Sequence, residues 1–343
     1  MSKQIKSYPG IDILKILMAI CVVSIHTLPA GWFINPTARL VYDFLCASAV
    51  PFFFVSSGFL LAQKIESRSL SDPNPQLTVI TASLKKFAKM YLLWMLIYSP
   101  LALWDLIHSN RGFVKGILVY LHGFFLVGEH YNSWPLWYLL STVYGLCFLW
   151  VLSKRKTPLK HIVLVSLIFF FCGEAISYLM ENAHILPGTL SGIVGALSEL
   201  LFPGRIVNGF LYISIGMLAY DRKFSNPMGI LFLLLHLAAQ LSGIVFIVTL
   251  CRPLSGLGLL ILASNAPLKS RPVYALMRKL SVVLYFLHMY VWTFYYTVVY
   301  QQKSFGLDSF LMTTLICILI GMIYSSRGKI CRILSKHQYS ARF

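Results

Sequence analysis

Three ionisable residues lie in an apolar stretch near the N-terminus, and their spacing places them on one side of a helix. Asp12, Lys15 and His26 occur in the segment YPGIDILKILMAICVVSIHTLP. At about 100° per residue, the three side chains fall within roughly 60° of one another on a helical wheel. An ionisable group at membrane depth costs at least a few kcal/mol unless it is paired or faces water. We therefore expect this stripe to line a protein interior or a wet cavity.

Lys15 and His26 could do chemistry together, at a separation of about 16 Å of helical rise. A neutral His is a natural general base near pH 7, and it can take a proton from a hydroxyl that attacks an acyl carbon. A cation on the same face could hold a phosphate or polarise a carbonyl. The structural alternative is that Asp12 and Lys15 are interfacial anchors and that His26 ends the helix near the headgroups.

A second polar stripe occurs near residue 285. Ser281, Tyr285 and His288 are spaced i, i+4 and i+7 in another apolar run, so they share one helix face. His288 could be a satisfied core residue, or it could line the same cavity as His26. The second interpretation predicts that the two stripes face each other.

Two further features admit both a structural and a functional interpretation. Small residues in VPFFFVSSGFLL (residues 50–61) favour close helix packing. Trp137, in the segment WPLWYL, and Arg205 each stand at the start of an apolar run. They could form an interfacial belt, or they could contact an acidic or sugar-linked acceptor.

The elements that position these residues are predicted to be membrane-spanning helices. The 343-residue chain is 58% hydrophobic and only 12% charged, with a mean hydropathy of +0.74. This composition predicts an all-α, multi-pass protein of the plasma membrane and one polytopic domain over residues 1–343. The expected spans, about ten, are 11–29, 41–63, 87–107, 134–152, 161–180, 206–220, 228–248, 254–265, 280–300 and 306–325. The apolar stretch from Gly116 to Gly128 is short for a crossing, so we interpret it as a re-entrant or interfacial helix.

The distribution of basic residues predicts the topology. With both termini in the cytoplasm, most Lys and Arg fall in inner segments, as the positive-inside rule requires. The basic residues of the outer segments are then only Arg39, Arg111, Lys115, Arg205, Arg252 and Lys303. This distribution explains the formal charge of +18 without a nucleic-acid partner. The largest outer segments, 107–135 and 181–204, are a plausible place for a polar acceptor.

Several motifs are absent from the sequence. The seven cysteines form no CxxC or other metal spacing, so no metal site is expected. The chain also has no P-loop, GxSxG, HExxH or dinucleotide fingerprint. These absences leave ATP-driven transport and zinc or serine hydrolysis without motif support.

Taken together, the motifs resemble those of the membrane-bound acyltransferase family 3, whose members are O-acyltransferases of cell-envelope glycans. The resemblance rests on GIDILK followed by His26, VPFFFVSSGFLL, KKFAK, LWYL, GRIVNGFLYISIGML and LSVVLYFLHMY. Within this family the chain looks most similar to the membrane half of the serine racemases of vancomycin resistance. We expect it to lack the racemase domain, since the sequence ends at Phe343.

The resemblance implies an acyl-CoA donor at the cytoplasmic face and an acceptor outside. In the first span the family has a basic residue, ten residues and then the essential His, a spacing that Lys15 and His26 match. Lys86 and Lys89 match the basic pair before its third span. The chain has Lys at these positions where Arg is usual, and Lys lacks the bidentate fork that Arg offers to phosphate.

The leading hypothesis is a bacterial acyltransferase that moves an acetyl or short acyl group from acyl-CoA to a hydroxyl. The acceptor would be an extracytoplasmic glycan, a peptidoglycan precursor or a lipid-linked molecule. The catalytic residues would be His26, as general base or acyl carrier, with His288 and with Asp12 tuning Lys15. The donor would contact Lys15, Lys86 and Lys89, and the acceptor would contact Arg205, Tyr285 and Trp137.

We expect no permanently bound cofactor. The expected partners are the lipid bilayer and the two substrates, and a homodimer is one assembly that we consider. The alternative function is a non-enzymatic permease or binding module for an amino acid such as serine. The similarity to racemase membrane domains and the Arg-to-Lys changes motivate this alternative.

Overall fold

A computed structural model describes residues 6–28, 30–109, 112–200, 203–300 and 305–340. Within these ranges every regular element is a helix. The α-helices are α1 (Pro9–Thr27), α2 (Pro36–Arg68), α3 (Pro75–His108), α4 (Phe113–His122), α5 (Trp137–Lys154), α6 (Leu159–Glu181), α7 (Gly188–Leu200), α8 (Pro203–Arg222), α9 (Asn226–Leu241), α10 (Val245–Asn265), α11 (Pro272–Phe294) and α12 (Leu307–Ser340). The short 3-10 and π segments are η1 (Ala30–Trp32), η2 (Gly123–Val127), η3 (Trp134–Leu136), η4 (Ala183–Ile185) and η5 (Tyr295–Tyr300).

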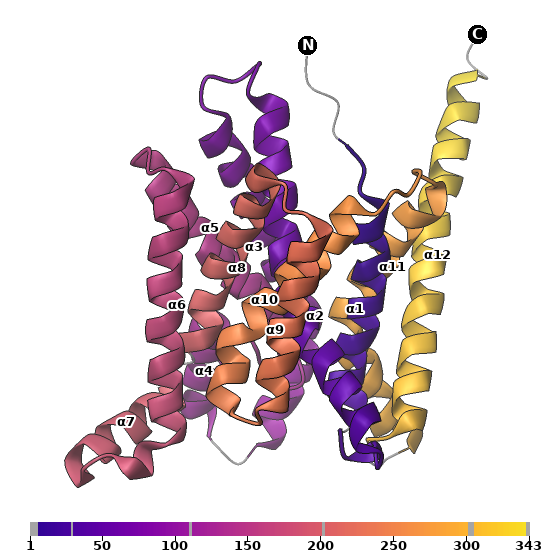
Figure 1. Ribbon diagram of the computed structural model, residues 1–343. Helices are drawn as coiled ribbons and strands as arrows, with labels where there is room; N and C mark the ends of the chain where they lie inside the picture. The colour runs from indigo at the N-terminus through magenta and orange to yellow at the C-terminus, as the bar shows by residue number, and fades with distance from the viewer. Residues whose placement is uncertain (1–5, 29, 110–111, 201–202, 301–304, 341–343) are drawn as a thin grey trace. The chain divides into compact units, whose positions relative to one another are not determined.

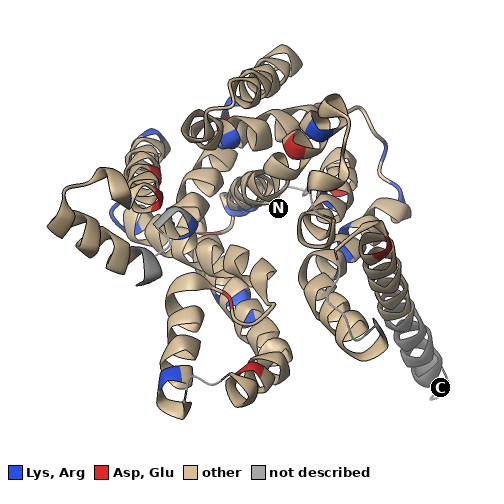
Figure 2. Cartoon of the chain, turned by 90° about the horizontal axis from the view of Figure 1, so that it is seen from below, with Lys and Arg blue, Asp and Glu red and all other residues tan. Residues whose placement is uncertain are grey.

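Eight helices in the described part of the chain are long and apolar enough to cross a membrane. They contain α1, α2, α3, α5, α6, α10, α11 and the first part of α12. The helices α8 and α9 occur where the sixth and seventh spans were predicted. Charged residues are sparse along the helices (Figure 2). The structure therefore confirms the all-α integral membrane fold.

The chain divides into two compact units. The first contains residues 50–265 and the short segment before Tyr8, and the second contains residues 8–49 and the chain from residue 266 onward. Helix α2 belongs to both units, with Pro51 next to the boundary.

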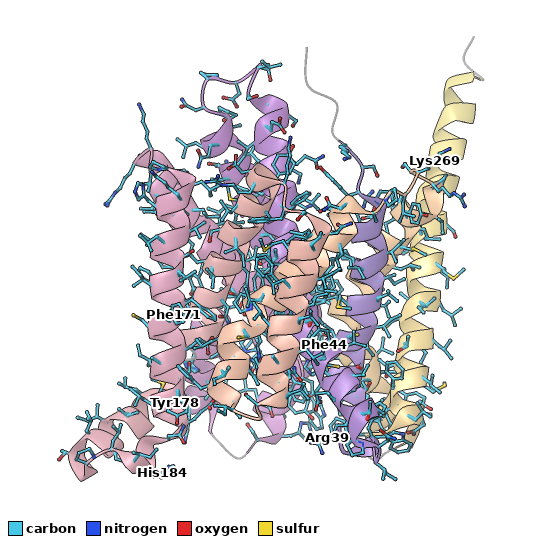
Figure 3. The ribbon with its side chains drawn as sticks, viewed as in Figure 1. Arg39, Phe44, Phe171, Tyr178, His184 and Lys269 are labelled. Carbon is cyan, nitrogen blue, oxygen red and sulfur yellow. The ribbon has the colours of Figure 1, made fainter. Side chains whose placement is uncertain are left out.

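In the second unit α1, α11 and α12 pack side by side (Figure 1). A backbone hydrogen bond of 3.0 Å from Gly306 to the carbonyl of Thr27 ties the start of α12 to the end of α1. Arg39 and Lys269 lie at opposite ends of this unit (Figure 3). This is the arrangement expected for one outer and one inner residue.

In the first unit α8 packs between α5 and α6, and α9 pairs with α10. Glycines allow the closest approach, because a Cβ atom added at Gly58 would overlap the backbone carbonyl of Ile213. A Cβ atom at Gly216 would overlap the carbonyl of Val55 in the same way. These contacts confirm that the small residues of VPFFFVSSGFLL form a helix-packing surface.

The predicted bounds of two spans were wrong. The seventh span was expected to reach residue 248, but α9 ends at Leu241 and Gly243 follows with a left-handed φ of 68°. The eighth was expected to begin at residue 254, but α10 begins at Val245 and contains Pro253. Proline is tolerated inside membrane helices because neighbouring groups satisfy the freed backbone carbonyl.

Two segments predicted to lie outside the cell contain helices of their own. The short helix expected between Gly116 and Gly128 is present as α4 followed by the π turn η2, and it ends at Gly128 with a left-handed φ of 79°. The segment 181–204 contains α7, which extends away from α6 (Figure 1) and was not predicted. The labelled aromatic residues of α6, Phe171 and Tyr178, are exposed side chains (Figure 3).

Candidate functional site

His26 and His288 meet in the second unit, where α1 and α11 pack along their length. Their ring centroids are 5.3 Å apart and the ring planes are inclined by 24°, so the imidazoles stack. This contact was predicted from the spacing of the two polar stripes, and it is confirmed. It places two groups that can transfer protons at one point between two apolar helices.

The surroundings of His288 fix its tautomer. The side chain is fully buried, and its Nδ1 atom lies 2.9 Å from the carbonyl oxygen of Leu284. A carbonyl oxygen can only accept, so Nδ1 carries a proton and donates it. In the neutral ring Nε2 then holds the lone pair, and this buried atom has no hydrogen-bond partner within the described residues. Beside His26 the site therefore offers an acceptor for a hydroxyl.

An ion pair joins the other ends of the two stripes. The guanidinium of Arg278 lies 3.4 Å from the carboxylate of Asp12, whose side chain is only 8% exposed. The charge of Lys15 also acts on Asp12. The sequence analysis paired Asp12 with Lys15 and missed Arg278, although Arg278 stands three residues before Ser281 and continues its stripe.

Ser281 and Tyr285 lie between these two contacts along α11. Both side chains are buried, with exposed fractions of 2% and 3%. The ring of Tyr285 meets Phe286 edge to face, with centroids 4.8 Å apart. The predicted stripe thus faces the interior of the second unit.

In the first unit Arg205 lies beside Trp137 and Glu129. Its guanidinium is 2.6 Å from the Glu129 carboxylate and 5.7 Å from the centre of the Trp137 ring. Burial raises the pKa of Glu129 above its ordinary value, and the positive charge of Arg205 offsets part of that rise. Two predicted acceptor-side residues, Arg205 and Trp137, are therefore close together beside the Glu129 carboxylate.

Lys86 and Lys89 are exposed on α3, three residues apart and so on one face. Lys64 of α2 is close enough to Lys86 for their like charges to interact. These three residues form a basic group near the cytoplasmic ends predicted for the second and third spans, although α3 itself begins eleven residues before Lys86. Their charge suits a phosphate-bearing ligand or anionic lipid.

Comparison with known proteins identifies the family. A family model described as an acyltransferase domain matches residues 8–326, which is nearly the whole chain. The chain belongs to acyltransferase family 3. The resemblance found in the sequence motifs is therefore confirmed, and the protein is a membrane-embedded member of an acyltransferase family.

The relatives of this acyltransferase-family protein include larger proteins. An amino-acid racemase of Enterococcus faecalis is 27% identical over 165 residues, which cover 48% of this chain and 21% of the racemase. A serine/alanine racemase of Enterococcus gallinarum is 29% identical over 245 residues, which cover 64% of this chain and 34% of the racemase. The chain thus matches about a third or less of the length of these relatives. No solved structure matches it.

The predicted site residues of this acyltransferase-family protein fall into two sets. Asp12, Lys15, His26, Tyr285 and His288 belong to the second unit, and Lys86, Lys89, Arg205 and Trp137 belong to the first. Within the described residues no group of three or more His, Cys, Asp or Glu could hold a metal ion. In the second unit the stacked His26 and His288 rings are groups that can transfer protons.

Proposed function

We propose that the protein is an O-acyltransferase of the cell membrane. It would move an acetyl or other short acyl group from cytoplasmic acyl-CoA to a hydroxyl of an extracytoplasmic glycan or other envelope molecule. The stacked His26 and His288 rings carry this proposal, because together with the family assignment they supply the base that an acyl transfer needs.

The transfer itself breaks one bond and forms another. The hydroxyl oxygen of the acceptor attacks the thioester carbonyl while His26 takes the hydroxyl proton. The carbon–oxygen bond forms and the carbon–sulfur bond breaks, and the departing thiolate receives a proton, so coenzyme A leaves as a thiol. In a variant of this route His26 first accepts the acyl group and then passes it to the hydroxyl.

The remaining residues would bind and orient the substrates. Lys15, Lys86 and Lys89 would attract the phosphates of the donor from the cytoplasmic side, as point charges. His288 would hold the ring of His26 by stacking. The predicted contacts of the acceptor are with Tyr285, and with Arg205 and Trp137.

The test is transfer from radiolabelled acetyl-CoA in membranes that contain measured amounts of the protein. We expect His26→Ala to lower the rate at least ~100-fold, the lower range for loss of a general base. Ile25→Ala is the matched control, because Ile25 is the preceding residue and its side chain is 42% exposed. Equal rates in the two variants would contradict the proposal.

A second candidate function is binding or transport of an amino acid without acyl transfer. It is favoured by the alignment of 64% of the chain with a serine/alanine racemase. Uptake of labelled serine into proteoliposomes that contain no acyl donor would support this candidate. Donor-dependent labelling of a glycan would support the acyltransferase.

A further inference from the structure

The first unit contains a cavity where three of its helix connections meet. It has a volume of about 810 Å³ and is lined by the connection from α2 to α3, the connection from α5 to α6 and the end of α8. This volume is in the range of sites that hold small molecules, which is roughly 300–1,000 Å³. All three connections belong to segments that the positive-inside rule predicts to be cytoplasmic.

Three exposed lysines line this cavity. Lys154 and Lys156 come from the end of α5 and the turn after it, and Lys223 follows α8. Cations at these places complement the C-terminal ends of the two helices, and they also attract anionic lipid. Both effects account for the charge of the lysines, but neither accounts for the cavity that the lysines share.

The two carboxylates of the lining are each engaged by a neighbouring group. Glu66 of α2 accepts a hydrogen bond from the hydroxyl of Tyr220 on α8. Asp221 lies 3.9 Å from the guanidinium of Arg222. Three ammonium groups against two carboxylates leave the lining with a net positive charge, which favours an anion as the ligand.

Two helices begin at the cavity, and neither start is capped by a side chain. Helix α3 begins at Pro75 after Asn74, and α6 begins at Leu159 after Pro158. All four residues line the cavity. The first N–H groups of a helix have no carbonyl partner within it and form the positive end of its dipole, so they favour a nearby anion.

Ser153 adds a buried hydrogen-bond donor to the same lining. Its side chain is 7% exposed, and its Oγ atom accepts a hydrogen bond of 2.8 Å from Nε2 of Gln76. Among the described residues its own hydroxyl hydrogen has no acceptor. A buried donor without an acceptor costs free energy, and an oxygen atom of a ligand removes that cost.

Apolar side chains complete the lining and indicate its depth in the membrane. They include Ala62 and Ile65 of α2, Leu77 of α3 and Met217 of α8. Ala62 and Met217 stand near the cytoplasmic ends predicted for the second and sixth spans. The cavity is therefore predicted to lie at the boundary between membrane and cytoplasm, where phosphate groups occur both on lipids and on free compounds.

The cavity is separate from two of the residues predicted to bind the acyl donor. Its deepest position along α3 is Leu77, and Lys86 follows nine residues later, which is about 14 Å of helical rise. Lys89 lies further along the same helix. A single phosphate group cannot contact both sets of residues over this distance.

We propose that this cavity binds a phosphate group presented at the cytoplasmic face, at a site distinct from the predicted donor residues. The inference goes beyond the proposed acyl transfer. Lys156 and Lys223 would offset the charge of the phosphate, and Ser153 would donate a hydrogen bond to one of its oxygen atoms. Two sources carry this chemistry: an anionic lipid of the inner leaflet and a free phosphorylated compound.

The experiment uses two probes that share one phosphate head. Glycerol 3-phosphate is free in solution, whereas dihexanoyl phosphatidic acid carries two short acyl chains. Binding of each radiolabelled probe is measured by equilibrium dialysis with the full chain in phosphatidylcholine nanodiscs, and the signal of empty nanodiscs is subtracted. Saturable binding that is tighter for phosphatidic acid would identify a lipid, and equal saturable binding would identify a free compound. No saturable binding of either probe would overturn the proposal.

Variants locate the binding. We expect the double substitution Lys156→Gln and Lys223→Gln to weaken it about tenfold or more, because two charge-assisted contacts are lost. Ser153→Ala should also weaken it. The matched control is Arg155→Gln with Lys160→Gln, which removes the same charge from exposed residues outside the lining. Equal weakening by the two double variants would mean general attraction to a positive surface and would overturn the site.

Acetyl-CoA separates this site from the donor site. We expect Lys86→Ala to leave probe binding unchanged and acetyl-CoA not to displace the probe. Full displacement by acetyl-CoA would place the donor in this cavity and overturn the proposal of a distinct site. The absence of acyl transfer would contradict the transferase alone, because probe binding needs no acyl donor. If a variant does not fold, saturation in the parent protein and competition by acetyl-CoA still decide.

Discussion

Asp12 and Arg278 differ in their access to water, and this difference decides what each contributes. The Arg278 side chain is 55% exposed, whereas that of Asp12 is 8% exposed. An exposed partner makes the ion pair itself weak, about 0 to 1 kcal/mol. A buried carboxylate that loses one of its cations is more costly, because less of its desolvation is offset, and for Asp12 only the charge of Lys15 then remains.

We therefore expect Arg278→Ala to destabilise the protein by about 1 to 3 kcal/mol. Asp12→Asn should cost less, because the amide is neutral and can still form hydrogen bonds. Thermal unfolding in detergent measures both variants, with exposed Lys279→Ala as the neighbouring control. Similar losses for all three variants would mean that the pair does not bear on stability.

Burial lowers the pKa of His130 from its usual value of 6.5 to about 4. The folded protein then binds this proton less readily than the unfolded chain does. The stability that depends on neutral His130 is present above pH 6.5 and is lost as the pH falls towards 4. We expect His130→Gln to flatten the dependence of the melting temperature on pH in this window.

The control for this pH series is His184→Gln, because the His184 side chain is exposed in η4. Its pH dependence should follow that of the parent protein. An unchanged slope in His130→Gln would show that other groups cause the loss of stability at low pH.

At the scale of the elements, close contacts between α2 and α8 depend on glycine. The backbones approach so closely at Gly58 that the Ile213 carbonyl occupies the place of a Cβ atom. Lipid tails are as apolar as the helix surfaces, so close van der Waals packing rather than the hydrophobic effect holds such helices together. Any side chain at Gly58 must push two backbones apart.

Gly58→Ala is therefore expected to destabilise the first unit by about 1 to 3 kcal/mol, the usual cost of overpacking. Gly192→Ala in α7 is the matched control, because nothing lies within 4 Å of the Cβ atom it would add. The control should be neutral or slightly stabilising, since Ala favours helix more than Gly by up to about 1 kcal/mol. Melting temperatures in detergent report both effects, and equal shifts would refute the packing argument.

At the scale of the whole molecule, the distribution of basic residues predicts which ends of the helices face the cytoplasm. Most basic residues lie in segments predicted to be cytoplasmic, where they are attracted to anionic lipid. In the second unit Arg39, predicted to be outside, and Lys269, predicted to be inside, lie at opposite ends (Figure 3). This topology can be tested without any assumption about activity.

A membrane-impermeant maleimide should label Arg39→Cys in intact cells and should label Lys269→Cys only after permeabilisation. Both substitutions are made in a background in which the native cysteines are replaced by serine. Labelling of Lys269→Cys in intact cells, with Arg39→Cys protected, would invert the predicted topology.

The amino-acid sequence by itself determined the membrane fold, most spans and the facing stripes of the first and ninth spans. Backbone groups in lipid must be satisfied within a helix, so apolar runs of sufficient length become helices whatever their neighbours. Helical periodicity then places residues such as Asp12 and His26 on one face before any partner is known.

The tertiary structure decided which groups meet. Asp12 and its partner Arg278 are 266 residues apart in the chain, and the approach of Arg205 to Glu129 also joins different elements. A cavity of about 620 Å³ beside His130 forms where α4 and residues 127–131 lie against the end of α3. Such contacts depend on how helices dock through their small residues and side-chain shapes, which local periodicity does not encode.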